Sequence, residues 1–286
     1  MKVTDIINDE KPSLSFEVFP PKTDAVFESI RQATEDVAWL CPDYMSVTYG
    51  AGGGTSEYTV SIAANIQKRF HVPVVAHITC ISSTREGVQK QLAAMKQAGL
   101  VNVLALRGDI PEGGNTPGVY AHASDLIPEI MEAGDFCVGC ACYPEGHPDS
   151  PNQKDDIKHL KDKVDAGCSY LVTQMFFDND VFFNFLYKVR EAGITVPVVP
   201  GIMPVTNAKQ VNRIRTLSGQ NIPPRFRYIV DRFGDDPAAM TQAGIAYATQ
   251  QIVDLYANGI NAVHVYSMNN AKVAGQIKQN LSCIVK

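Results

Sequence analysis

The amino-acid sequence predicts an α/β fold, a (β/α)8 TIM barrel with extra helix between its seventh and eighth strands. Eight apolar, strand-like runs alternate with amphipathic, helix-like stretches along a chain of 286 residues. The first six runs begin about thirty residues apart, which is the usual length of one βα unit. No linker or shift in composition divides the chain, so we expect one domain over residues 1–286. A doubly wound open sheet is the alternative.

The predicted strands are short and mostly apolar, as strands covered on both faces are. They cover residues 13–19, 44–49, 73–80, 102–108, 137–144, 170–177, 196–203 and 261–268. The predicted helices include residues 84–98, 154–166, 207–217, 236–258 and 271–283. Several helix-like stretches end in Ala-Gly, at Gly99, Gly167 and Gly193, and a glycine in this position is a common helix C-cap.

Composition and charge argue against several classes of protein. The formal net charge of -5 comes from 25 basic and 30 acidic residues without a long run of either sign. This balance disfavours a nucleic-acid or anionic-membrane partner. The first residues lack the apolar core of a signal peptide, and no stretch reaches membrane-spanning length. We therefore expect a cytoplasmic protein.

The seven cysteines do not predict a disulfide scaffold in a chain of this length. Cys137 and Cys140 form a C-x-x-C pattern that is also found in metal and redox sites. Within a strand, however, their side chains point to opposite faces and cannot share a metal ion. We favour buried structural cysteines over metal ligands.

Polar side chains follow one predicted strand after another at its carboxyl end. Glu17 lies near the end of the first strand, and Asp109 directly follows the fourth. Barrel enzymes place their catalytic groups at this end of the strands, and two carboxylates suit acid/base chemistry. Two structural alternatives remain open, an ion pair of Glu17 with Lys22 or Arg107, and a turn or helix-cap role for Asp109.

Other common catalytic patterns are missing. The six histidines are scattered, no lysine lies within a predicted strand, and G-x-S-x-G is absent. The glycine cluster at residues 50–54 lacks the spacing of a P-loop. It predicts either a flexible loop at the barrel mouth, which we favour, or an anion-binding turn before a helix.

Seven short strings together identify a family resemblance. They are SFEVFPPK, SVTYGAGG, HITC, LALRGD, YPEGHP, TQMFFD and GIMPV, in this order between Ser15 and Asn269. In this combination the chain resembles methylenetetrahydrofolate reductase. The resemblance implies a barrel that holds FAD at the carboxyl ends of its strands. It also implies a ping-pong reaction, in which NADH or NADPH reduces FAD and reduced FAD then reduces 5,10-methylenetetrahydrofolate.

The resemblance also implies roles for individual residues. Glu17 matches the general acid, and its apolar strand is expected to raise its proton affinity. Asp109 matches an aspartate beside the flavin and the folate, while Gln174 and Gln210 match substrate-facing glutamines. The positions implied for FAD contact are Thr48, Tyr49, His77, Arg107, Gly108, Asp109, Ala121, Tyr143, His147, Asp156, His159 and Lys163. Of these, the cationic Arg107 and Lys163 suit the pyrophosphate.

Four positions depart from the pattern of well-known bacterial members. His159 and Asp162 replace an asparagine and an arginine near FAD, so neither is a firm contact. Ile214 replaces an aromatic residue that packs on folate and nicotinamide, and Asn270 replaces an arginine expected to meet the folate's acidic tail. These changes leave the identity of the electron donor open.

Two other functions therefore stay as alternatives. In the first, the chain is a flavin-holding subunit that receives electrons from a partner protein, since it has no iron–sulfur ligand set of its own. In the second, it is a flavin barrel of the proline-dehydrogenase type, which Glu17, Asp109 and Gln174 together disfavour. We expect either a homo-oligomer or a complex with an electron-transfer partner.

Overall fold

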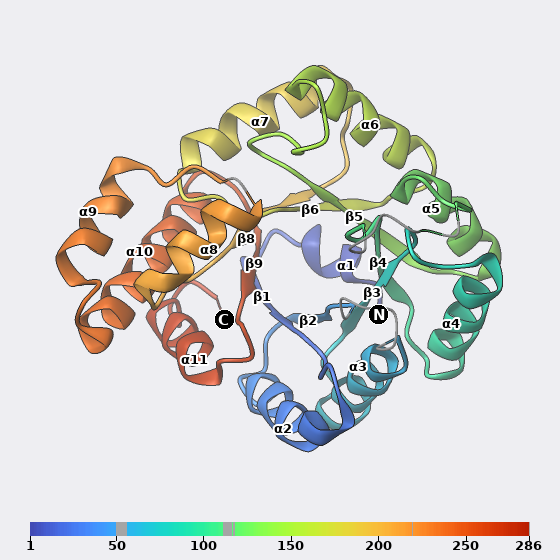
Figure 1. Ribbon diagram of the computed structural model, residues 1–286, viewed down its shortest axis with the longest axis horizontal. Helices are drawn as coiled ribbons and strands as arrows, with labels where there is room; N and C mark the ends of the chain where they lie inside the picture. Colours follow the sequence, from blue (N-terminus) through green and yellow to red (C-terminus); the bar gives the residue numbers. More distant parts are fainter. Residues whose placement is uncertain (50–55, 111–115, 117, 219, 286) are drawn as a thin grey trace.

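The computed structural model describes residues 1–49, 56–110, 116, 118–218 and 220–285. Parallel strands form one sheet at the centre, and helices surround it (Figure 1). The strands are β1 (Ser13–Val18), β2 (Tyr44–Val47), β3 (Val74–Thr79), β4 (Asn102–Leu106), β5 (Cys137–Cys142), β6 (Tyr170–Thr173), β7 (Val198–Val199), β8 (Gly201–Ile202) and β9 (Ala262–Tyr266). Their order across the sheet is β7-β6-β5-β4-β3-β2-β1-β9-β8.

The sheet closes through one strand that is broken at Pro200. β7 pairs with β6, whereas β8, which follows directly after Pro200, pairs with β9. Proline has no N–H group for a strand ladder, but its carbonyl oxygen accepts a hydrogen bond from His264 N–H at 2.9 Å. The predicted strand 196–203 thus joins both ends of the sheet. The closed arrangement confirms the predicted barrel and excludes the open sheet.

The main helices lie outside the strands, as the alternating sequence pattern predicts. They are α2 (Phe27–Ala38), α3 (Ser56–Phe70), α4 (Arg85–Gln97), α5 (Ala123–Ala133), α6 (Gln153–Asp165), α7 (Asn179–Glu191), α8 (Ala208–Ser218), α9 (Pro224–Phe233), α10 (Pro237–Ala257) and α11 (Ala271–Asn280). The extra helix between the last strands is confirmed by α8 and α10. The sequence analysis did not predict α9, which packs against α10 at the periphery (Figure 1).

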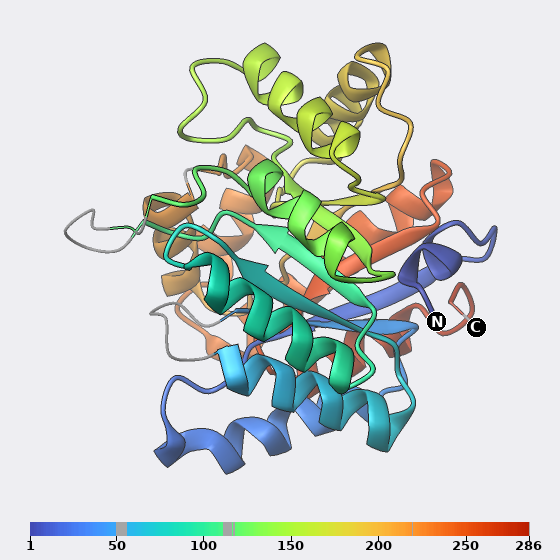
Figure 2. The same cartoon turned by 90° about the vertical axis from the view of Figure 1, so that its right-hand side faces the viewer.

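Alternation along each strand creates two separate cores. Outward-facing side chains such as Phe16, Val47 and Leu171 are buried against the helices. Inside the barrel, Tyr44 and Tyr170 belong to a smaller apolar cluster. A short helix that the sequence analysis missed, α1 (Val3–Ile7), packs on this cluster and lies at the amino ends of the strands (Figure 2). The barrel is therefore closed at that end.

Two strand glycines make room for tyrosine rings inside the barrel. A Cβ atom added at Gly139 would lie 2.3 Å from Cζ of Tyr170. At Gly201 it would lie 2.4 Å from the hydroxyl oxygen of Tyr266. Contacts this short do not occur, so a side chain at Gly139 requires the Tyr170 ring to move, and one at Gly201 also meets the Thr173 carbonyl oxygen at 2.5 Å.

The cysteine prediction is confirmed for the C-x-x-C pattern. Cys137 packs in the cluster inside the barrel, whereas Cys140 packs in the outer core between strands and helices. Over the described ranges, no group of three or more histidine, cysteine or acidic side chains is placed to hold a metal ion. Likewise, none of the described helices combines the length and apolar character needed to cross a membrane.

Candidate active site at the carboxyl ends of the strands

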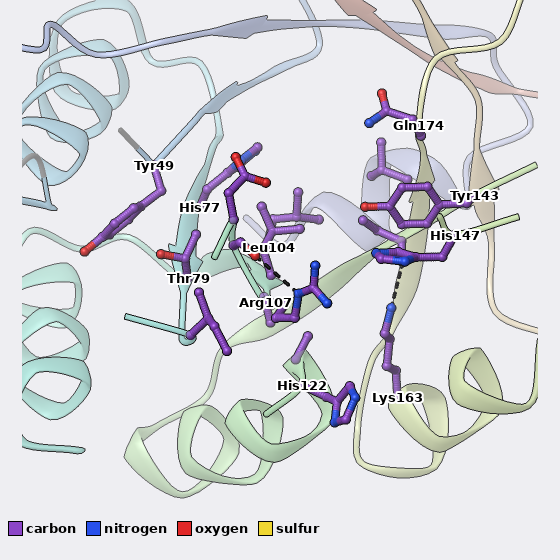
Figure 3. Close-up of a pocket in the computed structure, with 18 of the residues that line it drawn as sticks. Tyr49, His77, Thr79, Leu104, Arg107, His122, Tyr143, His147, Lys163 and Gln174 are labelled. Carbon is purple, nitrogen blue, oxygen red and sulfur yellow. Dashed lines mark hydrogen bonds between the residues drawn. The ribbon is translucent and has the colours of Figure 1, made fainter. Parts of the chain in front are cut away.

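A cavity of about 1610 Å³ opens at the carboxyl ends of the strands. Its lining side chains come from β1, β3, β4, β5, β6 and β9, from the loops after the strands, and from the surrounding helices, including α6. Figure 3 labels ten of these residues. The predicted site residues that line it are Glu17, Thr48, Tyr49, His77, Arg107, Gly108, Asp109, Tyr143, His147, Asp156, His159, Lys163 and Gln174. Two predicted residues, Ala121 and Gln210, are not part of this lining.

Glu17 lies between two imidazole rings. Its Oε2 atom is 3.6 Å from Nε2 of His77 and 3.6 Å from Nε2 of His264. The Ser46 hydroxyl donates to the same oxygen over 3.4 Å. The Glu17 side chain keeps 20% of its surface exposed, against 3% for His264, so Glu17 is the more accessible from the cavity. The alternative in which Glu17 pairs with Lys22 or Arg107 is not found, since its charged neighbours are the two histidines.

The electrostatics of Glu17 differ from the expectation. Burial raises its pKa, but hydrogen bonding to His264, the charges of the two histidines and the Ser46 hydroxyl together lower it below its usual value. The predicted rise in proton affinity is therefore wrong. The apolar strand predicts the burial correctly, but it gives no sign of the polar partners on β2 and β9.

His77 is held uncharged near neutral pH. Burial lowers its pKa to about 4, although the neighbouring Glu17 acts in the opposite direction. Its Nε2 atom is buried and has no hydrogen-bond partner in the described part of the chain. Buried polar atoms are usually paired, so this nitrogen marks a place where a bound molecule can supply a partner.

Arg107 holds a central position in the cavity wall (Figure 3). Its Nη1 atom forms an ion pair with Oδ2 of Asp149 at 2.7 Å. The Asp149 backbone N–H donates to Nδ1 of His147, whose ring packs edge-on against Tyr143. The arginine lowers the pKa of Asp149, while burial and the nearby arginine lower the pKa of His147. One loop thus carries both an anion and an uncharged ring next to Arg107.

The second cation of the cavity is Lys163 on α6. Its Nζ atom donates to the carbonyl oxygen of Ala141 on β5 at 3.1 Å. Asp156, about two helical turns before it, accepts a hydrogen bond from the His147 backbone N–H at 3.1 Å. Helix α6 therefore supplies a cation to the cavity and also fixes the loop that carries His147.

Asp109 lines the cavity three residues after the end of β4. Gly108 has a φ of 86°, in the left-handed region that favours glycine. A Cβ atom at Gly108 would also lie 3.0 Å from Cβ of Thr79. The backbone at Gly108 therefore passes close to β3 in a conformation that favours glycine. Arg107 and Asp109, on either side of this glycine, both line the same cavity.

The two predicted glutamines differ in position. Gln174 lines the cavity at the end of β6, and its amide oxygen accepts from the Met175 backbone N–H at 2.9 Å. The amide oxygen of Gln210 instead accepts from the backbone N–H groups of Thr206 and Asn207, at 3.0 and 3.2 Å. Gln210 thus caps the start of α8 in this structure.

The departures from the family pattern lie in different surroundings. His159 and Asp162 both line the cavity, and the His159 ring lies 6.2 Å from the ring of His122. Ile214 packs in an apolar cluster with Phe177 and neighbouring side chains, and is not among the lining residues. Asn270 caps α11 by accepting from a backbone N–H. The glycine cluster at residues 50–54 lies outside the described residues.

Comparison with known proteins places this chain in a family. The family model described as methylenetetrahydrofolate reductase matches residues 2–282. A 5,10-methylenetetrahydrofolate reductase of Pectobacterium carotovorum is 34% identical, over 94% of this chain and 90% of its own length. The chain belongs to the methylenetetrahydrofolate reductase family. Its relatives are oxidoreductases by name.

Other relatives of the family are longer. The maize protein named methylenetetrahydrofolate reductase (NADH) 1 is 36% identical over 99% of this chain, which spans 50% of the maize sequence. Among solved structures, a Clostridium thermocellum protein described as binding two copies of 5-methyltetrahydrofolic acid aligns with a TM-score of 0.68. That alignment covers 98% of this chain and 99% of the other at 17% identity, so it supports the fold alone.

The sequence analysis missed several polar residues that surround Glu17. Ser15, Ser46 and His264 were not predicted as site residues, yet they form the hydrogen-bonded surroundings of the carboxylate. Asp149, the ion-pair partner of Arg107, was also missed. The alternation of side chains along a strand could have indicated Ser15, because Ser15 and Glu17 are two positions apart and share the inner face of β1.

Proposed function

We propose that this protein reduces 5,10-methylenetetrahydrofolate to 5-methyltetrahydrofolate with FAD and a nicotinamide electron donor. The observation that carries the proposal is Glu17, a partly exposed carboxylate that lines the cavity together with Asp109 and Gln174. These three positions match the family's acid, flavin aspartate and substrate glutamine. In this proposal, residues 1–286 form one catalytic, flavin-binding domain.

The cavity suits a large anionic cofactor. Its volume of about 1610 Å³ exceeds the range of roughly 300–1,000 Å³ that is usual for one small ligand. Arg107 and Lys163 bring two fixed cations for a pyrophosphate, and Nε2 of His77 is a buried polar atom without a partner. When bound, FAD would supply the hydride transfer that protein side chains cannot perform.

The protein's own residues would handle the proton and the charge. Opening the folate's five-membered ring requires a proton on the departing nitrogen and produces an iminium cation. Glu17 would provide that proton as general acid. The carboxylate of Asp109 would stabilise the positive charge as it develops, and Gln174 would bind the folate or the nicotinamide in turn.

A partner protein as electron donor is the second candidate. Asn270 is uncharged where the family pattern has arginine, and it is engaged as a helix cap. Ile214 offers no aromatic surface and packs within an apolar cluster. Both changes concern ligand binding and leave Glu17 and Asp109 in place. This candidate therefore changes the source of electrons and keeps the folate chemistry.

Anaerobic absorbance measurements on the purified chain with FAD test the proposal. NADH or NADPH should bleach the flavin band, and methylenetetrahydrofolate should restore it. Restoration of chemically reduced flavin, without bleaching by either nicotinamide, would transfer the electron-donor role to a partner protein. A chain that binds no flavin, or whose reduced flavin ignores the folate, would contradict the proposal. Turnover with proline in place of folate would support the proline-dehydrogenase alternative.

A further inference from the structure

The fixed charges around the cavity are negative on balance. Among the described lining residues, the acidic side chains are Glu17, Asp109, Asp149, Asp156 and Asp162. The basic ones are Arg107 and Lys163. The pyrophosphate of FAD would bring further negative charge to the same space. A site for this cofactor therefore needs positive charge beyond that of the lysine and the arginine.

One of the two fixed cations is already paired. Nη1 of Arg107 forms an ion pair with Oδ2 of Asp149 at 2.7 Å. Lys163 instead donates to the carbonyl oxygen of Ala141 at 3.1 Å, which leaves its charge uncompensated by that contact. A pyrophosphate would thus meet Lys163 as the cation that needs no displacement of a carboxylate among the described residues.

Four histidines also line the cavity, and two of them are held uncharged. The four are His77, His122, His147 and His159. Burial lowers the pKa of His77 to about 4, and burial together with the nearby Arg107 lowers the pKa of His147. His122 and His159, by contrast, are exposed. Histidine is the side chain whose charge ordinarily changes between pH 5 and 8, so these two rings can gain charge when an anion binds.

His122 and His159 lie close to each other and to the unpaired lysine. Their ring centroids are 6.2 Å apart, with the planes inclined by 31°. His122 directly precedes α5, and His159 lies on α6 four residues before Lys163, on the same face of the helix. In Figure 3, His122 and Lys163 lie on the same side of Arg107. Positive charges this close repel one another, and a bound phosphate offsets that repulsion.

The other titratable groups near the two rings keep their charge states between pH 6 and 8. Besides the lining residues named above, Asp125 lies three residues after His122, and Asp155 lies four residues before His159. Carboxylate, ammonium and guanidinium groups ordinarily stay charged in this range. The Cys80 thiol donates to the His122 carbonyl oxygen at 3.5 Å, and burial raises its pKa to about 12, so it stays uncharged.

We propose that His122 and His159 complete the phosphate site for FAD by taking up protons when the cofactor binds. This inference rests on the proposed function, because FAD is the cofactor proposed there. Each imidazolium would add a positive charge to that of Lys163 near the pyrophosphate. FAD would therefore bind more tightly as pH falls from 8 to 6, because proton uptake on binding is favoured by a higher proton concentration.

Isothermal titration calorimetry of the apoprotein with FAD counts these protons directly. At pH 7, titrations in buffers of low and high ionisation enthalpy give the number of protons taken up per FAD. We expect at least about half a proton in the wild type, since a nearby opposite charge raises a histidine pKa by roughly 1–3 units. His122→Asn and His159→Asn should each lower this number, and the double variant should bring it close to zero. His71→Asn, which removes another exposed histidine, should keep the wild-type value.

The affinity for FAD provides a second readout. Quenching of flavin fluorescence should give a Kd at least about threefold lower at pH 6 than at pH 8 in the wild type and in His71→Asn. In the double variant the Kd should no longer depend on pH over this range. Circular dichroism verifies that the variants remain folded, as expected for substitutions at exposed positions.

Two results would overturn the inference. The first is FAD binding to the wild type without proton uptake. The second is a double variant that takes up as many protons as the wild type, because the protons would then go to other groups. Normal proton uptake by a chain whose reduced flavin ignores methylenetetrahydrofolate would contradict the proposed function and leave this inference standing. A chain that binds no FAD would contradict both.

Discussion

Some side chains that line the cavity are already paired within the protein, and a ligand that binds them would have to compete with these partners. Arg107 is the clearest case, since its guanidinium is paired with Asp149 at 2.7 Å. A pyrophosphate that binds Arg107 must compete with this carboxylate. Asp149 is 61% exposed in its side chain, so the ion pair is partly screened by water and the competition is moderate.

Asp149→Asn should therefore strengthen FAD binding. Removal of a partly exposed ion pair frees about 0.2–1 kcal/mol, which corresponds to roughly a 1.5- to 5-fold lower Kd. Titration of the apoprotein with FAD, followed by quenching of flavin fluorescence, measures this change. Asp135→Asn removes an acid that pairs with Lys2 instead, and it should leave the Kd unaltered. Weaker FAD binding in Asp149→Asn would show that the carboxylate helps to hold the cofactor.

At this scale the sequence predicted cavity residues well and their partners poorly. Strand-end positions such as Thr48, Arg107 and Tyr143 were predictable because parallel strands all end at one edge of a barrel. The buried partners of Glu17 were not, because Ser46 and His264 lie within apolar strands and resemble ordinary core positions. Gln210 was assigned to substrate binding by resemblance, but its amide oxygen accepts a hydrogen bond from the backbone at the start of its own helix.

Secondary-structure elements are positioned by packing that local sequence patterns only partly reveal. Gly99, Gly167 and Gly193 have positive φ angles directly after α4, α6 and α7, as their Ala-Gly pattern predicts. Helix α1 has only five residues, too few to be stable alone, and depends on contacts such as the hydrogen bond from Val3 N–H to Asn102 Oδ1. The break at Pro200 follows from pairing with two different strands, which no single window of sequence displays.

Gly139→Ala tests how tightly the barrel interior is packed. The added methyl group would meet the Tyr170 ring, so we expect the variant to lose about 1–3 kcal/mol of unfolding free energy. Urea denaturation monitored by circular dichroism measures the loss. Gly275→Ala provides the control. Gly275 lies within α11, and a Cβ atom there would meet only the Leu40 side chain, at 3.4 Å. That change should stabilise the protein by up to about 1 kcal/mol. Equal stability of the two variants would contradict the close fit at Gly139.

The stability of the whole molecule depends on pH because burial lowers the pKa of His77, the histidine next to Glu17. His77 has a pKa of about 4 in the folded protein, against 6.5 for an ordinary histidine. Folding thus favours the neutral ring. Above pH 6.5 the ring is mostly neutral in the unfolded chain as well, so the unfolding free energy is little affected there. As pH falls from 6.5 towards 4, the unfolded chain binds a proton that the folded protein refuses, so stability decreases. The lowered pKa of Glu17 acts with the same sign, at lower pH.

We therefore expect a pH-dependent loss of stability that belongs to His77. Between pH 7 and pH 5 its contribution to the unfolding free energy should fall by about 2 kcal/mol. In His77→Gln this part of the decrease should disappear, whereas the exposed control His71→Asn should keep it. Urea titrations at both pH values measure the difference. An unchanged slope in His77→Gln would mean that the His77 ring becomes protonated without cost.

The catalytic account of the whole molecule depends on a division between two half-reactions in one cavity. In the proposed function, reduction of the flavin by its donor would need no acid at Glu17, whereas reduction of the folate would need a proton from it. Anaerobic stopped-flow absorbance of the wild type and Glu17→Gln measures each half separately. We predict unchanged bleaching by the electron donor and a loss of at least about 10²-fold in reoxidation by methylenetetrahydrofolate. Equal effects on both halves, or full folate activity in the variant, would contradict the role assigned to Glu17.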